Sequence, residues 1–369
     1  MQSQDILRGE KLALKQAGAK VGRFKIRLVS LDDATAQAGT WTPEQTAANA
    51  RKALGDDSTI AYLGEYNSGA SAISLPILNE GMVPQVSPAT IATGLTTTGP
   101  GADEGEPDKY YPTGERTYVR VVPRDAIQGA ALATLMQDEG CEQAYLINDQ
   151  EVYGEGLAAS TEAAAKKIGL EVIGNEGIEK TSPNFRSTAD KLASEGADCV
   201  VFTGITANGA VQLFKDLAAG LPDAKLFGSS GVAEAAFTDP DEGGIPSKVA
   251  QRVVITAATL PRDRYPAAGQ KFFRDFEREY GEENPATFAI YGYEAMALVL
   301  DAMERAGEQA NNREAVLKEL FATKGRESAL GTYDIDRNGD TSLTTTGTNT
   351  IQDGQLVVEE AIEPKGLEP

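Results

Sequence analysis

The stretch that decides the fold runs from residue 60 to residue 96 and reads IAYLGEYNSGASAISLPILNEGMVPQVSPATIATGLT. It begins with a short apolar run and continues into a small polar loop, Tyr66 to Gly69. A helical segment follows from about Ala70 to Asn79, and a second apolar run leads to another polar loop at Ser87 to Thr90. Strand, loop, helix, strand and loop in this order predict a parallel α/β sheet.

Both polar loops directly follow predicted strands. In open α/β sheets, ligands bind beyond the carboxyl ends of the strands, and the amides at a helix start favour an anion there. Asn67, Ser68 and Thr90 offer hydroxyl and amide groups for a carboxylate. The same residue types are also typical of helix caps and turns, so the pattern alone leaves the binding and capping interpretations open.

These residues also carry a resemblance that extends over nearly the whole chain. Four more segments fall in the order and spacing of one family: LVSLDD (28–33), RVVPRDAIQ (120–128), YLINDQEVYGEG (145–156) and FGSSGVAE (227–234). Together with residues 60–96, they resemble the branched-chain amino acid-type solute-binding proteins of ABC importers, the leucine/isoleucine/valine-binding protein family. The resemblance implies the type I periplasmic-binding fold: two doubly wound parallel-sheet α/β lobes, joined by a three-crossover hinge, with the ligand cleft between them.

The resemblance also implies the lobe boundaries. Lobe one would comprise residues 1–121 plus 257–330, and lobe two residues 122–256 plus 331–369. The three crossovers would then fall near 121–125, 256–260 and 331–336.

The family's first lobe begins with a strand ahead of the helix that matches Ser3 to Ala17, and this strand is missing from the sequence. In a doubly wound sheet that strand lies inside the sheet. The alternation of Phe24, Ile26 and Leu28 predicts the next strand of the same lobe. The sequence has no signal peptide. We therefore expect that Met1 is a misplaced or truncated start, and that a signal peptide and the missing strand lie upstream.

For the ligand carboxylate, the resemblance implies two loops in lobe one. Asn67 and Ser68 match the first loop, and Ala89 would contribute backbone groups from the second. Ile91 stands where the family commonly has threonine, so the adjacent Thr90 is the alternative hydroxyl donor.

Three aromatic residues are also expected at the site. Tyr153 matches the tyrosine that closes over the ligand from lobe two, and Phe288 matches an aromatic that lines the side-chain pocket. Tyr66 would add a further wall. The alternative interpretations are a surface tyrosine at a helix start for Tyr153 and an ordinary helix core for Phe288.

Two departures from the family pattern concern the ligand's amino group. Ile205 replaces a frequent tyrosine, and Ser230 stands where the amino acid binders usually have an acid that pairs with the ligand ammonium. A buried ammonium without its partner is costly. Either Glu234 supplies the charge, or the ligand is an aliphatic or aromatic carboxylate or a small amide.

The composition excludes several other classes of protein. The chain of 369 residues contains no histidine and two cysteines, so a four-ligand Cys/His zinc site cannot form. It contains no phosphate-binding P-loop and no Gly-x-Ser-x-Gly motif, and the net charge of −21 argues against nucleic acid. Asp334 to Asp340 resembles the start of a calcium loop, but its twelfth position is Thr345. A tight turn is therefore favoured there, and we expect neither a metal nor a cofactor.

Cys141 lies just before the predicted strand 144–148, and Cys199 begins the strand 199–203. If lobe two follows the 2-1-3 order of doubly wound sheets, these strands are neighbours. The two residues then form a disulfide or remain two separate buried thiols.

We interpret the chain as a non-enzymatic, extracytoplasmic and monomeric receptor of an ABC importer. It would bind a small carboxylate-bearing molecule by hinge closure and present it to a membrane permease. Its place would be the periplasm or the cell surface, with a lipid anchor as one option. The alternatives are a ligand sensor of the same fold that acts on a regulatory partner and, from another class, an α/β enzyme of flavodoxin-like or Rossmann type.

Overall fold

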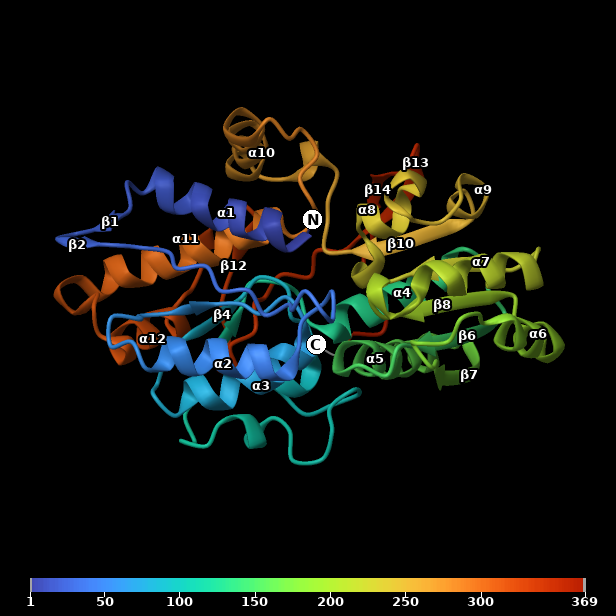
Figure 1. Cartoon of the computed structure of the whole chain (residues 1–369), viewed down its shortest axis with the longest axis horizontal. Helices are drawn as coiled ribbons and strands as arrows, with labels where there is room; N and C mark the ends of the chain where they lie inside the picture. Colours follow the sequence, from blue (N-terminus) through green and yellow to red (C-terminus); the bar gives the residue numbers. More distant parts are fainter. Residues whose placement is uncertain (1, 368–369) are drawn as a thin grey trace. The chain divides into compact units, whose positions relative to one another are not determined.

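The computed structural model describes residues 2–367 and divides into two compact units (Figure 1). Unit 1 comprises Met1–Arg124 and Arg262–Leu343, and unit 2 comprises Asp125–Pro261 and Thr344–Pro369. The chain therefore passes from one unit to the other three times. Among the described residues, no helix has both the length and the apolar character of a membrane span.

Unit 1 contains six α-helices and seven short strands among the described residues. The helices are α1 (Gln2–Gln16), α2 (Pro43–Leu54), α3 (Ser68–Asn79), α10 (Ala267–Tyr280), α11 (Ala289–Ala306) and α12 (Arg313–Phe321). The strands are β1 (Lys20–Val21), β2 (Phe24–Lys25), β3 (Tyr62–Leu63), β4 (Gln85–Ser87), β5 (Tyr118–Arg120), β11 (Arg326–Glu327) and β12 (Thr332–Tyr333).

The central sheet of unit 1 has the strand order β3-β4-β5, and all three strands are parallel. The predicted strand from Phe24 to Leu28 must be corrected. Only Phe24 and Lys25 form a strand, which pairs antiparallel with β1, and residues 26–33 belong to no strand. Among residues 26–30 of the described structure, only the amide of Ile26 donates to a backbone carbonyl, that of Ala19 at 2.9 Å. A strand continues only as far as a neighbouring strand pairs with it.

The helices of unit 1 begin and pack for recognisable local reasons. The hydroxyl of Thr42 caps α2 by accepting a hydrogen bond from the amide of Gln45 at 3.4 Å, and Pro43 occupies the first turn. Helix α1 lies along α11, where Gly9 and Gly292 each face backbone atoms of the other helix (Figure 1). A side chain at either position would collide with that backbone, so the two glycines allow this close approach.

Unit 2 is built around one seven-stranded sheet with the order β14-β13-β10-β9-β8-β6-β7. Its helices are α4 (Asp125–Asp138), α5 (Val152–Ile168), α6 (Arg186–Glu195), α7 (Ala210–Gly220), α8 (Ala235–Thr238) and α9 (Ser247–Ala250). Its strands are β6 (Gln143–Asn148), β7 (Glu171–Gly177), β8 (Cys199–Thr203), β9 (Lys225–Gly228), β10 (Val253–Ala257), β13 (Gly347–Gln352) and β14 (Gln355–Ala361).

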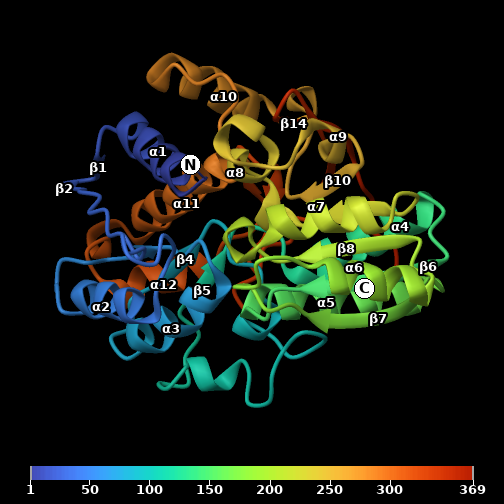
Figure 2. The same ribbon diagram turned by 45° about the vertical axis from the view of Figure 1, so that its right-hand side comes forward.

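The five strands β6 to β10 are parallel, and β6 lies between β7 and β8. This is the 2-1-3 order, so the strand that follows Cys141 and the strand that begins at Cys199 are neighbours. Apolar side chains of α6 and α7 pack against alternate side chains of the central strands, such as Val200 and Phe202, and form one apolar core with them. Helices α4 and α5 cover the other face of the sheet (Figures 1 and 2). A doubly wound sheet of this kind exposes its loops at the carboxyl ends of the strands.

Cys141 and Cys199 are joined by a disulfide, with their Cα atoms 5.8 Å apart. The bond follows from the strand order, because Ala144 on β6 pairs directly with Cys199 on β8. It lies at the amino-terminal edge of the sheet, away from the loops that follow the strands.

The predicted boundary between the lobes must be corrected near the end of the chain. Residues 331–343 belong to unit 1 and not to the second lobe. The reason is a set of contacts with β5: the amide of Arg120 donates to the carbonyl of Gly339, and its guanidinium pairs with Asp340. The strand-turn-strand of unit 2 begins only at Gly347, where β13 and β14 form an antiparallel hairpin on the sheet.

Candidate ligand-binding site

The two polar loops of unit 1 lie side by side beyond the carboxyl ends of β3 and β4. The hydroxyl of Ser68 accepts a hydrogen bond from the amide of Ala92 at 3.3 Å. The hydroxyl of Ser71, one turn further along α3, donates to the hydroxyl of Thr90 at 3.2 Å. The structure therefore brings together the loop residues that the sequence predicted for a carboxylate.

Helix α3 directs its amino-terminal end into this region. Asn67 holds the N-cap position, but its side chain makes no capping hydrogen bond. The first-turn amides of α3 therefore receive no acceptor from the cap residue, and they carry the positive end of the helix dipole. Ser68 is the first residue of the same turn. Its hydroxyl accepts a hydrogen bond from the Ala92 amide, so the hydroxyl proton can still be donated to a ligand.

The prediction for Thr90 must be corrected. Its side chain is fully buried, and its hydroxyl lies 2.5 Å from the hydroxyl of Tyr118 and donates to that of Ser87 at 2.7 Å. The amides of Ala89 and Thr90 also donate to Ser87, at 3.2 and 3.0 Å. The Thr90 hydroxyl and the Ala89 amide, the two predicted donors, thus both make hydrogen bonds inside unit 1 and fix the shape of the loop.

The group that the sequence missed is the amide of Ile91. Within residues 2–367 this N–H donates to no acceptor, although both neighbouring amides do. The side chain at position 91, on which the sequence prediction depended, is apolar and 4 % exposed. No sequence signal could have found this donor, because every residue except proline has the same amide.

Two aromatic residues of unit 1 lie edge to face at the same end. The ring centroids of Tyr66 and Phe288 are 6.0 Å apart at an interplanar angle of 75°. Phe288 is buried and immediately precedes α11. Tyr66 directly precedes Asn67 in the chain, and the role of the two rings as walls of a ligand pocket stays a prediction.

Two acidic residues with raised pKa values, Glu65 and Asp33, lie at this end of unit 1. Burial and the neighbouring Asp33 carboxylate raise the pKa of Glu65 to about 7, and the hydroxyl of Tyr62 donates to Glu65 at 2.8 Å. Burial also raises the pKa of Asp33. Because Glu65 is directly followed by the 66–69 loop, its protonation changes the charge beside the candidate carboxylate donors.

In unit 2, the predicted residues Tyr153 and Ser230 are in direct contact. Their hydroxyl oxygens are 3.1 Å apart, and the amide of Gly231 donates to Tyr153 at 3.2 Å. The hydroxyl of Ser230 donates to the side-chain oxygen of Gln128 at 3.0 Å. Burial is the main cause that raises the pKa of Tyr153, and the nearby Asp125 carboxylate adds to it. The Tyr153 hydroxyl is therefore neutral at physiological pH.

The loop that carries Ile205 is held by a buried acid. Asp149, which directly follows β6, accepts hydrogen bonds from the Ile205 amide at 3.0 Å and from the Asn208 side chain at 2.8 Å. Desolvation raises the pKa of this carboxyl above its usual range. Asp149 thus fixes the loop after β8. Gly204 of this loop directs its carbonyl toward the α-carbon of Gly231, so the loop lies next to Gly231.

Sequence reasoning missed Gln128 and Asp149 as members of this group. Both belong to segments that carried the family resemblance, 120–128 and 145–156. Glu234, the predicted alternative source of charge, is the N-cap residue of α8. Its side chain makes no hydrogen bond to Tyr153 or Ser230 in the described part of the chain.

The turn from Asp334 to Asp340 behaves as the sequence predicted. Asp336 accepts hydrogen bonds from the amides of Asn338 and Asp340 at 2.8 and 2.9 Å, which is an Asx-type turn. Asp340 itself pairs with Arg120. These carboxylates are therefore occupied by protein partners.

Comparison with known proteins identifies the family of the chain. The family model of the periplasmic binding proteins matches residues 1–348. Among curated relatives, Leu/Ile/Val-binding protein homolog 3 of Brucella melitensis biotype 1 is 26% identical over 347 residues, which cover 93% of this chain and 84% of the relative.

Two solved structures share the fold. The leucine binding protein LivK of Thermotoga maritima MSB8 aligns with a TM-score of 0.82 at 23% identity, covering 99% of this chain and 95% of that one. A solute binding protein of an ABC transporter from R. palustris, in complex with benzoate, aligns with a TM-score of 0.76 at 19% identity, covering 99% and 94%. The chain described here belongs to the periplasmic binding protein family.

Proposed function

We propose that this protein is a solute-binding receptor of an ABC importer and that it binds a small molecule with a carboxylate group. The observation that carries this proposal is the donor group of unit 1: the Ser68 hydroxyl, the uncapped first turn of α3 and the open amide of Ile91. Hydrogen bonds from several neutral donors can hold an anion at such a helix end. A receptor needs no catalytic base, which fits a chain without histidine.

Tyr153, Ser230 and Gln128 of unit 2 would contact another part of the same ligand. Each contributes a neutral hydroxyl or amide. The ligand would stabilise a closed arrangement of the two units, since it adds contacts that only this arrangement provides. Closure predicts a smaller radius of gyration in solution scattering when ligand is added.

We further propose that the preferred ligand is not a simple branched-chain amino acid. At position 230 the family's amino acid binders usually have an acid, whereas Ser230 offers only a neutral hydroxyl, which lies 3.1 Å from the hydroxyl of Tyr153. A carboxylate without an ammonium group, of aliphatic or aromatic type, avoids burying an unpaired positive charge. Benzoate in the R. palustris protein is one example of such a compound.

An extracytoplasmic location and a membrane permease as partner complete the proposal. The Cys141–Cys199 disulfide supports an oxidising compartment. The net charge of −21 supports a monomer that binds no nucleic acid. Cell fractionation tests the location, and co-purification with the detergent-solubilised permease tests the partner.

A ligand panel tests the binding proposal. It contains L-leucine, L-isoleucine, L-valine, 4-methylpentanoate and benzoate, and the readouts are the thermal unfolding midpoint and titration calorimetry. A ligand that binds only the folded protein raises its midpoint by mass action. We expect 4-methylpentanoate or benzoate to bind more tightly than leucine, from which 4-methylpentanoate differs only by the amino group.

The variants Ser230→Asp and Ser230→Thr serve as a matched pair. Ser230→Asp should shift the preference toward leucine, and Ser230→Thr should leave the order of the panel unchanged. Tight leucine binding by the unchanged protein would contradict the assignment of ligand class, and Asp125→Asn and Glu234→Gln would then locate the compensating acid.

A further inference from the structure

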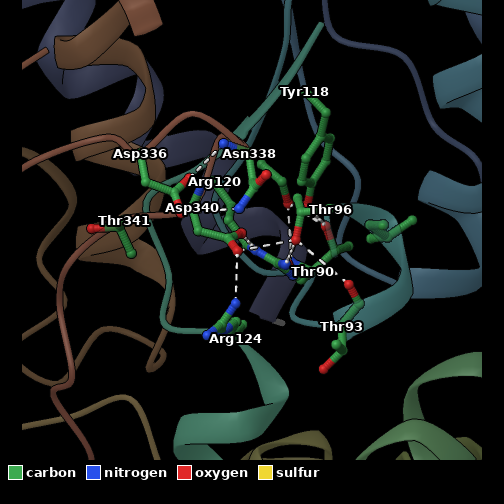
Figure 3. A network of polar contacts seen from close by, with 12 residues as sticks. Thr90, Thr93, Thr96, Tyr118, Arg120, Arg124, Asp336, Asn338, Asp340 and Thr341 are labelled. Atoms are coloured by element: carbon green, nitrogen blue, oxygen red, sulfur yellow. Dashed lines mark hydrogen bonds and ion pairs between the residues drawn. The ribbon is translucent and has the colours of Figure 1, made fainter. Parts of the chain in front are cut away.

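A fully buried arginine lies directly behind the candidate carboxylate loop. Arg120 is the last residue of β5, and none of its side chain is exposed. Its Nε donates to Asp340 at 2.7 Å, and one terminal nitrogen donates to the carbonyls of Ala92 at 2.9 Å and Thr90 at 3.3 Å. The other terminal nitrogen donates to the hydroxyl of Thr96. Figure 3 shows Arg120 between Thr90, Thr96 and Asp340.

Asp340 is the counter-charge that makes this burial possible. Besides Arg120, its carboxylate accepts hydrogen bonds from Thr96 at 3.1 Å and from Arg124 at 3.3 Å. In the Asx turn, the carboxylate of Asp336 accepts a hydrogen bond from the amide of Asp340 at 2.9 Å, which positions Asp340 (Figure 3). A buried guanidinium without such a partner is strongly unfavourable.

The guanidinium determines which way the loop amides face. The peptide bond between Thr90 and Ile91 is trans, so its carbonyl and its N–H point in opposite directions. Because Arg120 holds the carbonyl of Thr90, the N–H of Ile91 points away from the buried cation. The carbonyl of Ala92 is held in the same way, and the amide of Ala92 reaches Ser68.

We infer that Arg120 and Asp340 are positioning residues for anion binding, because they fix the orientation of the Ile91 amide and of Ser68 without touching the ligand. This inference rests on the proposed carboxylate site. The same pair also joins segments close to two of the places where the chain leaves unit 1, after Arg124 and after Leu343. The loop that would bind the ligand is therefore hydrogen-bonded to Arg120, and Arg120 belongs to the network that contains Arg124 and Asp340.

The test compares Asp340→Asn with Glu294→Gln. Glu294 forms another buried ion pair of unit 1, with Arg326 at 2.7 Å, and it has no hydrogen bond to residues 87–97 in the described structure. Both variants remove one buried charge, so both should lower the thermal midpoint. Only Asp340→Asn should weaken binding of the panel compound that binds most tightly, by about tenfold or more, which corresponds to about 1.4 kcal/mol.

A second readout does not depend on any ligand. Hydrogen exchange followed by mass spectrometry on the free protein reports the amides of Ala89, Thr90 and Ala92, which are hydrogen-bonded in this structure. We expect faster exchange in peptides covering 87–97 for Asp340→Asn and no change there for Glu294→Gln. Thr96→Val, which removes one hydroxyl from the network, should show the same effect at smaller size even if Asp340→Asn does not fold.

The outcomes separate this inference from the proposed function. If Asp340→Asn and Thr96→Val bind within twofold of the unchanged protein and exchange normally at 87–97, the pair is merely structural and the inference is overturned. If the unchanged protein binds no panel compound, the proposed ligand class fails, and the exchange experiment still decides whether the pair orders the loop.

Discussion

At the scale of single residues, the hydrogen bonds open to a ligand at the candidate site come from the backbone more than from the polar side chains of the sequence. Thr90 has the hydroxyl that a carboxylate site needs, yet its side chain is fully buried and satisfied. Ile91 has no polar side chain, yet its amide is open. The hydroxyl of Ser68 lies at the start of α3 beside the 88–92 loop, and its role in binding stays a prediction.

Ser68→Ala should therefore weaken ligand binding. Loss of one hydrogen bond to a charged group costs about 1.5–3 kcal/mol, measured by calorimetry with the panel compound of highest affinity. Ser74→Ala is the matched control, since Ser74 lies on the same helix and its hydroxyl accepts from Gln85 at 3.0 Å. An equal loss of affinity in both variants would mean that Ser68 acts only through the stability of α3.

Glu10 provides a prediction about pH. Desolvation by burial raises its pKa to about 8 from 4.5, so the folded protein binds this proton more tightly than the unfolded chain does. The contribution of this proton on Glu10 to the free energy of unfolding is fully present below about pH 4.5 and is lost as the pH rises through 8. The free energy of unfolding should then fall by up to about 1.4 kcal/mol for each pH unit in this window.

Urea unfolding of Glu10→Gln at pH 5 and pH 8 measures this effect. We expect the variant to be more stable than the unchanged protein at pH 8 and to show a flatter pH dependence. Glu80→Gln changes an exposed carboxylate and should leave the pH dependence as it is. Parallel pH curves for the protein and Glu10→Gln would contradict the prediction.

At the scale of elements, local signals found most helices, whereas strands depended on their neighbours. The Thr42 cap and Pro43 mark the start of α2 as the sequence indicated. The alternating residues from Phe24 to Leu28 had an equally clear strand pattern, but most of this segment has no strand partner. A helix makes its hydrogen bonds within its own segment, while a strand needs another segment, which local pattern cannot supply.

The packing of α1 on α11 gives a prediction at this scale. An added methyl group at Gly9 would collide with the backbone at Ala289 and Tyr293. Gly9→Ala should therefore destabilise the protein, by about 1–3 kcal/mol as for other overpacked sites, despite the better helix propensity of alanine. Gln4→Ala, at an exposed position of the same helix, should change the urea midpoint very little. A gain in stability for Gly9→Ala would show that the two helices separate easily.

At the scale of the whole molecule, the chain is organised as two units joined by three crossings. The third crossing falls after Leu343 because Asp340 and Gly339 bind β5 of unit 1. Unit 2 has the disulfide, and unit 1 contains no cysteine. The two units therefore differ in how strongly their stability depends on redox conditions.

The double variant Cys141→Ser, Cys199→Ser should have a lower free energy of unfolding. The bond closes a loop with a sequence separation of 58, and its removal is expected to cost about 2–4 kcal/mol. Urea unfolding followed by circular dichroism measures the change. Addition of a reductant should lower the stability of the unchanged protein toward that of the variant and should not affect the variant itself. Equal midpoints with and without reductant would show that the bond adds no stability.

The sequence by itself indicated the α/β class of fold, and its motifs carried the resemblance to the family, whereas the strand order of unit 2 was shown by the structure. The fold class follows from hydrophobic periodicity and turn residues, and the resemblance follows from the order of motifs along the chain. It also indicated which loops carry the candidate site, because those loops follow strands in a parallel sheet.

Only the tertiary structure decided which atoms of those loops remain free. Ser87, Tyr118 and Ser71 use the hydroxyl of Thr90, and Arg120 orients the backbone so that the amide of Ile91 is left open. The arginine in turn depends on Asp340, which is 220 positions further along the chain. Hydrogen-bond satisfaction in a buried network is a property of all its members together, so no local stretch of sequence specifies it.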